Sequence, residues 1–392
     1  MKKNTVVLIL IVTAVVGAAL YFRINYRPPI ETKFVQNVED DEQRNTKTSE
    51  NTEDDVIVSD SSTPDLTLHK EPIDLKEPGD YAQLTNNYHV YQSFNNCGPA
   101  TLSMAMAWYG VKVSQEELAG KMRPYQHPKG DNDDKTIFTY EFVNWANEYG
   151  LQAIARVNGD IELLKKFISN GIPVVVKTWL KPNEDIGHFR FVTGYDDNKQ
   201  IIIQDDSYDG PNKKIGYYDF LTMWQAFNYS YVVVYTPDLK EKVESIIGEE
   251  IDEQVAWENA LKRAEKESEK DETSPYPYFN MSVASYHLRD YERSVKEFER
   301  VENKLPGRML WYQIEPIKAY QELKNYDKVF EIIENILENG NRSFSELYMI
   351  KGEIYLEQGL KDKAKEQFEL ALKFNTNMEE AKTALEDLES EN

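Results

Sequence analysis

The chain has a single cysteine, Cys97, in the sequence Asn-Asn-Cys-Gly-Pro-Ala-Thr-Leu. Pro99 favours the first turn of a helix, because the amide hydrogen that proline lacks would have no partner there. Leu102, Ala105 and Met106 then recur at helical spacing. We therefore expect Cys97 at the N-terminus of a buried helix, where the helix dipole lowers the pKa of a thiol and favours the reactive thiolate. The alternative is a small buried side chain without chemistry.

A base and a carboxylate follow in a predicted β-hairpin, whose two strands are joined by a polar turn at residues 196–199. His188 opens the first strand and Asp205 closes the second. Because the strands of a hairpin are antiparallel, the start of one lies beside the end of the other. The sequence thus brings His188 and Asp205 together as a base and the group that orients it. Asp206 follows directly, and the sequence leaves open which carboxylate faces the imidazole.

Residues from about 88 to 237 resemble the papain-like cysteine peptidases of family thirty-nine, the group that includes the double-glycine leader peptidases of bacteriocin export. Four features carry the resemblance: Gln92 five residues before the cysteine, the Asn-Cys-Gly-Pro-Ala sequence, Gly-His-Phe with Val-Thr-Gly-Tyr behind it, and a strand that ends at Asp205. The resemblance implies an α+β papain-like fold. It also implies Cys97 as nucleophile, His188 as general base and acid, Asp205 as orienter and Gln92 as a donor to the oxyanion.

Length, composition and net charge limit the number of domains and the kinds of partner that the chain can have. It has 392 residues, 41% of them hydrophobic, which is enough for two or three packed domains. The formal net charge of −23 argues against nucleic acid as a partner, because phosphate binding needs clustered Lys and Arg. One cysteine excludes an internal disulfide framework.

Two acidic segments suggest a metal site, and neither fits a ligand pattern. The loop 124–135 contains His127 and several aspartates, but their spacing matches no ligand set, so we expect an exposed rim loop. Residues 205–210 mimic the start of a calcium loop, yet Gly216 stands where the closing glutamate would be. We therefore expect a turn there, no metal site and no other cofactor.

The N-terminal residues carry a membrane signal. After Lys2 and Lys3, residues 5–22 are long and apolar enough to span a bilayer. We expect a membrane anchor over residues 1–23, with a cleavable signal peptide as the alternative. The lysines favour a single-pass protein of the cell membrane with its catalytic and repeat domains outside the cytoplasm, or a secreted protein if the segment is cleaved. Residues 24–80 are polar and acidic, which predicts a disordered linker.

The peptidase-like domain is expected over residues 81–238, followed by a connecting helix over 239–274 and an all-α region over 275–392. In this last region an internal repeat has a period of 35 residues, and it aligns Phe298 with Ile333 and Phe368. The pattern resembles tetratricopeptide repeats, which stack into a solenoid whose concave face binds peptide or protein. We therefore expect a protein partner on the repeats, with a helical appendage that binds nothing as the alternative.

Two features of the repeats bear on their packing. Pro316 falls within a predicted helix, which predicts a kink or a shifted boundary in the second repeat. Gly352 and Gly359 fall where small residues let paired helices approach each other.

The sequence thus predicts a membrane-anchored cysteine peptidase that hydrolyses a peptide or protein substrate through a thioester on Cys97, with its substrate or a partner recruited by the repeats. One alternative is an inactive papain-like domain that binds peptides and acts as a scaffold. Another is a cell-wall amidase or transpeptidase, because the same thioester can pass to an amine. The sequence contains no phosphate loop that ends in Gly-Lys-Ser/Thr, so the transporter context of leader peptidases gives no guide to the substrate.

Overall fold

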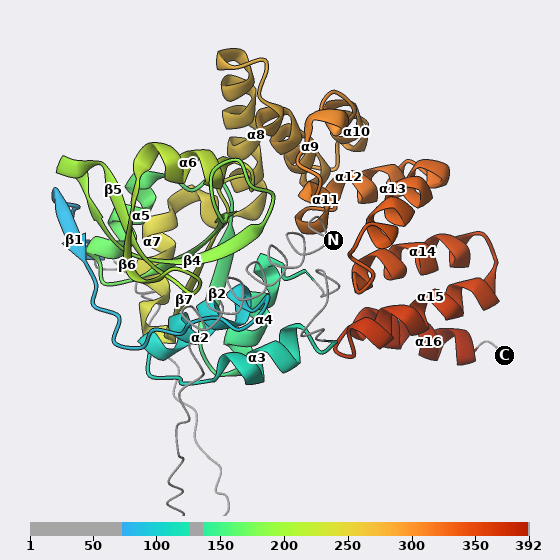
Figure 1. Cartoon of the computed structure of the whole chain (residues 1–392), viewed down its shortest axis with the longest axis horizontal. Helices are drawn as coiled ribbons and strands as arrows, with labels where there is room; N and C mark the ends of the chain where they lie inside the picture. Colours follow the sequence, from blue (N-terminus) through green and yellow to red (C-terminus); the bar gives the residue numbers. More distant parts are fainter. Residues whose placement is uncertain (1–72, 126–135, 391–392) are drawn as a thin grey trace, which may run out of the picture. The chain divides into compact units, whose positions relative to one another are not determined.

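The computed structural model describes residues 73–125 and 136–390, and all of them lie in one compact unit (Figure 1). The membrane anchor predicted for residues 1–23 is outside the described residues, as is most of the predicted linker. Within the described ranges, no helix combines the length and apolar character that a membrane crossing requires.

One antiparallel sheet forms the centre of the first domain. Among the described residues it contains seven strands, and six of them follow the spatial order β2-β7-β3-β4-β5-β6, while β1 pairs with β4. The hairpin with a turn at 196–199 is found where the sequence predicts it. The strands are β1 (Tyr81–Gln83), β2 (Gln152–Arg156), β3 (Val174–Trp179), β4 (Gly187–Asp196), β5 (Ile201–Asp206), β6 (Gly210–Gly216) and β7 (Tyr231–Tyr235).

Helices cover both faces of this sheet because both faces are apolar. Val175 and Phe191 point into a core shared with the first three helices of the domain, while Val174 and Val176 point into a core on the other face. The first three helices are α2 (Cys97–Trp108), α3 (Gln115–Met122) and α4 (Thr139–Glu148). The helices of the other face are α5 (Ile161–Ser169), α6 (Tyr217–Gln225) and α7 (Lys240–Ile247).

Both predicted boundaries of this domain need correction. Residues 73–80, assigned to the linker, lie on the domain, since Leu75 packs on its core and the Lys76 amide donates to Asn170 Oδ1 at 2.9 Å. The single connecting helix predicted for 239–274 is two helices, α7 and α8 (Glu253–Lys270). The break falls at Gly248, whose φ of +69° suits glycine and ends α7.

The all-α region confirms the predicted period. Its helices form three antiparallel pairs and an end helix, and the second helix of each pair begins at Tyr291, Tyr326 and Lys361, which are 35 residues apart. The aligned Phe298, Ile333 and Phe368 are all buried. The helices are α9 (Pro275–His287), α10 (Tyr291–Glu299), α12 (Glu315–Glu322), α13 (Tyr326–Glu338), α14 (Ser345–Glu357), α15 (Lys361–Phe374) and α16 (Glu379–Ser390).

Pro316 lies in the first turn of α12 rather than inside a helix, so the boundary is shifted and the chain is not kinked there. The residues between α10 and α12 form an irregular segment, the excursion, which contains the short helix α11 (Met309–Tyr312). Gly352 does allow close approach, since a Cβ on it would lie 2.3 Å from the Phe368 ring. Gly359 does not, because it occupies a turn with φ +74° and an added Cβ would meet no described atom within 4 Å.

An aromatic cluster joins the two parts. Tyr312 of the excursion lies edge-on to Trp179 at the end of β3 and to Phe227, with ring centroids 5.8 and 6.1 Å away. These side chains belong to one hydrophobic core that continues through α8 to α14. The helical region is therefore packed on the domain that carries Cys97.

Candidate active site

Cys97 is the first residue of α2, as the sequence predicts. The residues that follow it in the first turns of α2 are buried, whereas Cys97 itself is half-buried and borders a cavity. Thr101, one turn further, donates from Oγ1 to the carbonyl oxygen of Phe189 at 3.3 Å. That bond fixes the N-terminus of α2 against the start of β4, which is where His188 lies.

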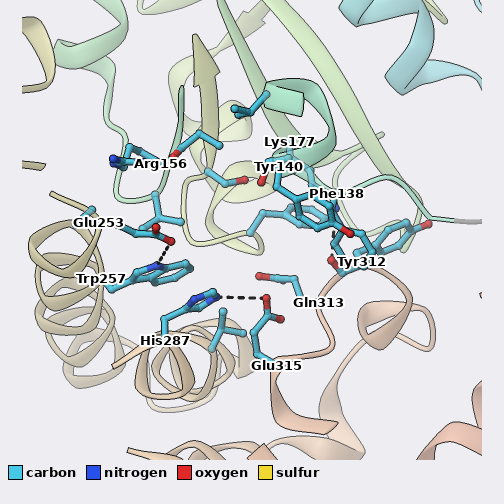
Figure 2. Close-up of a pocket in the computed structure, with 18 of the residues that line it drawn as sticks. Phe138, Tyr140, Arg156, Lys177, Glu253, Trp257, His287, Tyr312, Gln313 and Glu315 are labelled. Carbon is cyan, nitrogen blue, oxygen red and sulfur yellow. Dashed lines mark hydrogen bonds and ion pairs between the residues drawn. The ribbon is translucent and has the colours of Figure 1, made fainter. Parts of the chain in front are cut away.

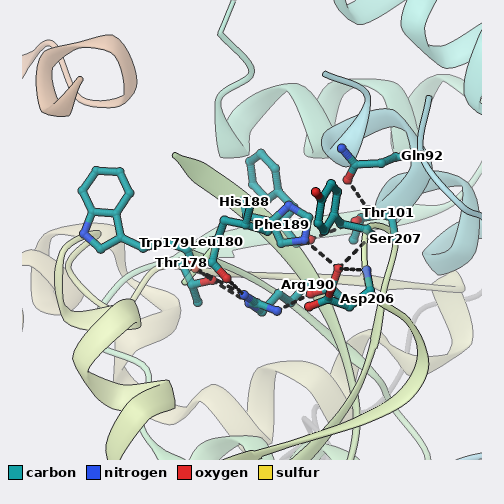
Figure 3. Close-up of polar contacts among 12 residues, drawn as sticks. Gln92, Thr101, Thr178, Trp179, Leu180, His188, Phe189, Arg190, Asp206 and Ser207 are labelled. Carbon is teal, nitrogen blue, oxygen red and sulfur yellow. Dashed lines mark hydrogen bonds and ion pairs between the residues drawn. The ribbon is translucent and has the colours of Figure 1, made fainter. Parts of the chain in front are cut away.

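His188 is buried and contacts both the thiol and a carboxylate. Its Nε2 lies 3.0 Å from Asp206 Oδ1 (Figure 3). The imidazole also shares a hydrogen bond with the Cys97 thiol, and Nδ1 is the nitrogen left for it. Cys97, His188 and Asp206 thus form a continuous series of thiol, imidazole and carboxylate, the groups that a thiol hydrolase uses as nucleophile, base and orienter.

The aspartate that faces His188 is Asp206, so the placement of Asp205 beside the imidazole is wrong. The cause is a β-bulge at Thr193, which shifts the register of β5 against β4 by one residue. A one-residue shift moves every following side chain to the other face of the sheet. Without the bulge Asp205 would share the face of His188, and with it Asp206 comes opposite Arg190 on that face. The pairs on either side of the bulge are Gly194 with Ile203 and Val192 with Gln204.

Asp205 has a different setting. Its Oδ2 accepts from Asn86 Nδ2 at 2.7 Å, and its Oδ1 accepts from the backbone amide of Asn212 at 2.8 Å. One oxygen therefore holds the loop that contains Asn86, and the other holds strand β6. The turn that the sequence expects at 205–210 lies between β5 and β6.

The ionisation of the three groups is coupled. Burial by itself would raise the pKa of the Cys97 thiol, but the hydrogen bond to His188 and the charge of its imidazole bring that pKa below the ordinary value. Burial opposes the charged form of His188 as well, yet bonds to Asp206 and Cys97 raise its pKa. Asp206 is also buried, and its bond to His188 and the nearby charges hold its pKa well below the usual range. The site thus favours a thiolate beside an imidazolium.

Gln92 lies at the rim of the same cavity. Its side-chain oxygen accepts from Ser207 Oγ at 2.9 Å, and its backbone amide donates to the Ser207 carbonyl at 2.8 Å. The bond to the oxygen orients the amide group, whose nitrogen is the end that can donate. This arrangement suits a donor for an oxyanion on the side of Cys97.

Arg190 is a site residue that the sequence reasoning missed. It is 3% exposed and forms an ion pair with Asp206 Oδ2. Its Nε also donates to Thr178 Oγ1 at 2.9 Å. The signal was available, because Arg190 follows His188 by two residues in the same predicted strand and so shares its face.

Arg123 was missed too, and it has no sequence signal of this kind. It follows α3 and is 2% exposed. Its guanidinium donates to the Asn95 carbonyl at 2.7 Å and to the side chain of Asn96, the residue before the nucleophile. Its charge also lowers the pKa of Cys97. Arg123 therefore holds the loop that leads into α2.

The cavity beside the thiol has a volume of about 400 Å³. Its rim carries the exposed side chains of Phe94, Ile186 and Tyr208. The helical region closes one side with Trp311 and Tyr312, and the Tyr312 hydroxyl hydrogen-bonds to the backbone of Gly187. The repeats thus contribute directly to the wall of the site, which the sequence did not suggest.

No group of three or more His, Cys, Asp or Glu side chains in the described ranges is arranged to hold a metal ion. Residues 126–135 of the acidic loop, which include His127, are not among the described residues.

Comparisons with solved structures give several matches. They include a Bacillus anthracis protein described as a C39-like peptidase (16% identity, TM-score 0.34), with 40% of this chain and 98% of that chain aligned. The peptidase domain of the Streptococcus transporter ComA is 18% identical with a TM-score of 0.30, over 38% of this chain and 96% of that chain. A tetratricopeptide protein of Thermus thermophilus is 19% identical with a TM-score of 0.29, over 34% of this chain and 73% of that chain.

A search of curated proteins gave no match. A family model does match, and the residues that it covers are 80–232. These residues contain α2, β4 and β5, and hence Cys97, His188 and both aspartates. The resemblance inferred from the motifs is confirmed for this segment, since residues 80–232 match the model of the Peptidase_C39 like family.

Proposed function

We propose that the chain is a cysteine peptidase that hydrolyses peptide bonds through a thioester on Cys97. The observation that carries the proposal is the hydrogen-bonded series from the Cys97 thiol through His188 to Asp206. A buried cysteine without chemistry has no need of an imidazole whose second nitrogen is held by a carboxylate. The lowered pKa of the thiol supports the same conclusion.

In the proposed reaction the Cys97 sulfur attacks the carbonyl carbon of the scissile bond, and its proton passes to His188. The carbonyl becomes an oxyanion, to which the Cys97 backbone amide and the Gln92 side chain donate hydrogen bonds. The imidazolium then protonates the leaving amine as the carbon–nitrogen bond breaks, which gives a thioester. Water, deprotonated by His188, attacks the thioester, and the acid product leaves with the thiol restored.

Asp206 and Arg190 act on this reaction through His188. The carboxylate keeps Nε2 protonated and so directs Nδ1 to the sulfur. Arg190 and the backbone amides of Tyr208 and Asp209 hold the carboxylate, the two amides at 2.8 and 3.0 Å from Oδ1. The imidazole can therefore take and return a proton without turning.

The test uses the chain with Cys97→Ser and Cys97→Ala. Cleavage of an unbiased peptide library and alkylation by iodoacetamide should both vanish in each variant, since Cys97 is the only thiol. Circular dichroism of the variants should match that of the parent chain. Cleavage that persists in the alanine variant would overturn the proposal. Alkylation of the parent chain without cleavage of any library member would favour the peptide-binding scaffold.

The setting of the peptidase is a further part of the proposal and depends on the sequence alone. The apolar residues 5–22 would anchor the chain in the cell membrane, with its domains outside the cytoplasm. Fractionation of cells that express the chain, followed by protease treatment of intact cells, tests this. Recovery in the cytoplasmic fraction would refute the anchor.

A further inference from the structure

A second cavity lies between the sheet and the helices, with a volume of about 470 Å³. Figure 2 shows its two walls, with Arg156 and Tyr140 on the side of the sheet domain and Trp257, His287 and Glu315 on the side of the helices. The proposed catalytic residues are not among those that line it. Its size is in the range of ligand pockets.

The sheet side of this cavity is the edge of a strand. Five consecutive residues, from Ala153 to Val157, line it. Successive side chains of a strand point to opposite faces, so a cavity that touches five in a row lies along the edge of the strand rather than on one face. β2 ends the spatial order of the sheet and, among the described strands, pairs with β7 alone. The main-chain N–H and C=O groups of its other edge are thus directed toward the cavity.

The opposite wall is preformed. The rings of Trp257 and His287 are stacked with centroids 3.9 Å apart. Trp257 Nε1 donates to Glu253 at 3.3 Å, and His287 Nε2 lies 3.5 Å from Glu315. These contacts hold a flat aromatic surface across the cavity from β2. Such a surface suits the side chains of an extended segment.

We propose that the free edge of β2 binds an extended segment of the substrate, away from the scissile bond, which adds to the sheet as a further strand. The inference rests on the proposed peptidase function for its choice of ligand. Main-chain hydrogen bonds to β2 would supply recognition, as in other cases of strand addition. Apolar side chains at alternate positions of the segment would contact Ile154, Val143 and Trp257, which line the cavity.

The substrate is the favoured occupant because the two cavities are neighbours. Lys177 and Tyr312 line both of them. Lys177 is 5% exposed, and its Nζ donates to the carbonyls of Ile137 at 3.3 Å and Tyr312 at 3.4 Å. This pair of residues is therefore the partition between the catalytic cavity and the edge of β2. A polypeptide bound beside Cys97 thus has the edge of β2 in the adjacent cavity.

The test selects peptides of about ten residues from a random displayed library on the full chain with Cys97→Ala. The same selection is made on this chain with Asn144→Trp added, and again with Asn147→Trp. Both asparagines are exposed on α4, but Asn144 lines the cavity and Asn147 does not. We expect enriched peptides that bind the parent and the Asn147 variant equally, and the Asn144 variant at least about tenfold more weakly, since tryptophan fills the cavity.

N-methylation separates strand addition from simple side-chain binding. A strand bound at an edge uses the N–H groups of alternate residues. Methylating one alternate set of the enriched peptide should abolish binding, and methylating the other set should leave it unchanged. Equal tolerance of both sets, or no peptide that distinguishes the parent from the Asn144 variant, would overturn the site.

The choice of substrate is tested with active Cys97. The enriched segment is joined to a cleavable reporter through linkers of graded length. We expect KM to fall by about fivefold or more at the best length with kcat unchanged, and Asn144→Trp to remove the gain. An unchanged KM at every length would overturn the assignment to the substrate. Because the first selection needs no cleavage, a chain that binds the peptide but cleaves nothing refutes the peptidase and leaves the β2 site standing.

Discussion

The sheet domain and the helical region are each held together by contacts of a different range. In the helical region each helix packs on its neighbours in the sequence, and the pattern returns after 35 residues. In the sheet domain the site unites Gln92 and Cys97 with His188 and Asp206, about a hundred residues further along the chain. Local periodic contacts can be read from a sequence. A site made from distant strands depends on their register, which one bulge at Thr193 decides.

The two regions meet at the excursion that contains α11. There the repeat departs from its pattern, because α12 begins late at Glu315 with Pro316 in its first turn. The residues released by this shift include Trp311 and Tyr312, which line the catalytic cavity. The irregular start of α12 thus lets the helical region contribute two side chains to the cavity beside Cys97 in the sheet domain. The contrast between local and distant contacts can be tested at four positions.

The largest effect is expected at Asp206, the aspartate that the strand register places beside His188. Asp206→Asn should lower kcat by about 10² to 10⁴, because the amide cannot hold the imidazole in the required tautomer, as removal of a triad carboxylate does in other hydrolases. Asp205→Asn is the matched control and should change kcat by less than about threefold, since its partners are Asn86 and the Asn212 backbone. Steady-state cleavage by both variants decides this. Equal losses of kcat in the two variants would mean that strand register does not decide which aspartate orients His188.

The coupling between Cys97 and His188 should appear in the pH dependence of alkylation. The thiol pKa is lowered and the imidazole pKa is raised. Iodoacetamide should therefore react well below the ordinary thiol pKa, and the rate should fall only as pH drops through the lowered value. Peptidase activity should fall as pH rises through the His188 pKa, because the leaving amine needs the imidazolium.

His188→Ala removes the partner of the Cys97 thiol but keeps the effect of burial on it, so the pKa of the thiol should rise. The alkylation rate at neutral pH should then fall by about tenfold or more, which corresponds to about one pKa unit. Gln92→Ala serves as the control, since it removes no charge and should slow turnover without moving the alkylation profile. An unshifted profile in His188→Ala would show that the thiol is not activated by the imidazole.

A smaller effect is expected at two helical glycines, one in the periodic region and one in the sheet domain, where the same substitution has opposite consequences. In Gly352→Ala the new methyl would meet the buried Phe368 ring, 2.3 Å away, and we expect a loss of about 1 to 3 kcal/mol in the free energy of unfolding. In Gly120→Ala, within α3, nothing lies near the added methyl, so a gain of about 0.5 to 1 kcal/mol is expected from the better helix propensity. Denaturant titration measures both. The same sign for the two variants would contradict the close helix approach.

The smallest effect is expected where the two regions meet. Tyr312→Phe removes the hydroxyl that bonds to the Gly187 backbone and keeps the ring in its aromatic cluster. We expect a loss of about 1 kcal/mol in stability and less than about threefold in kcat. Tyr218→Phe, at a side chain 82% exposed, should change neither quantity. A loss of activity as large as that of Asp206→Asn would mean that the helical region controls His188.

Much of the site was predictable because its motifs are short. The cysteine, its proline and the apolar spacing behind them predicted the start of α2 at Cys97, where the structure has it. The hairpin of β4 and β5 was predicted from two strands and a polar turn. Arg123 was not predictable, since its role depends on α3 lying beside the loop that precedes Cys97. The wall formed by Trp311 and Tyr312 depends likewise on packing between segments more than 200 residues apart.

The sequence by itself determined the nucleophile, the imidazole, the order of the elements and the repeat period, because these follow from local spacing and from side-chain types. Only the tertiary structure decided that Asp206 rather than Asp205 orients His188, that Arg190 supports it, and that the helical region walls the cavity. The physical reason is that strand register alternates side chains between two faces, so a single inserted residue exchanges one carboxylate for its neighbour.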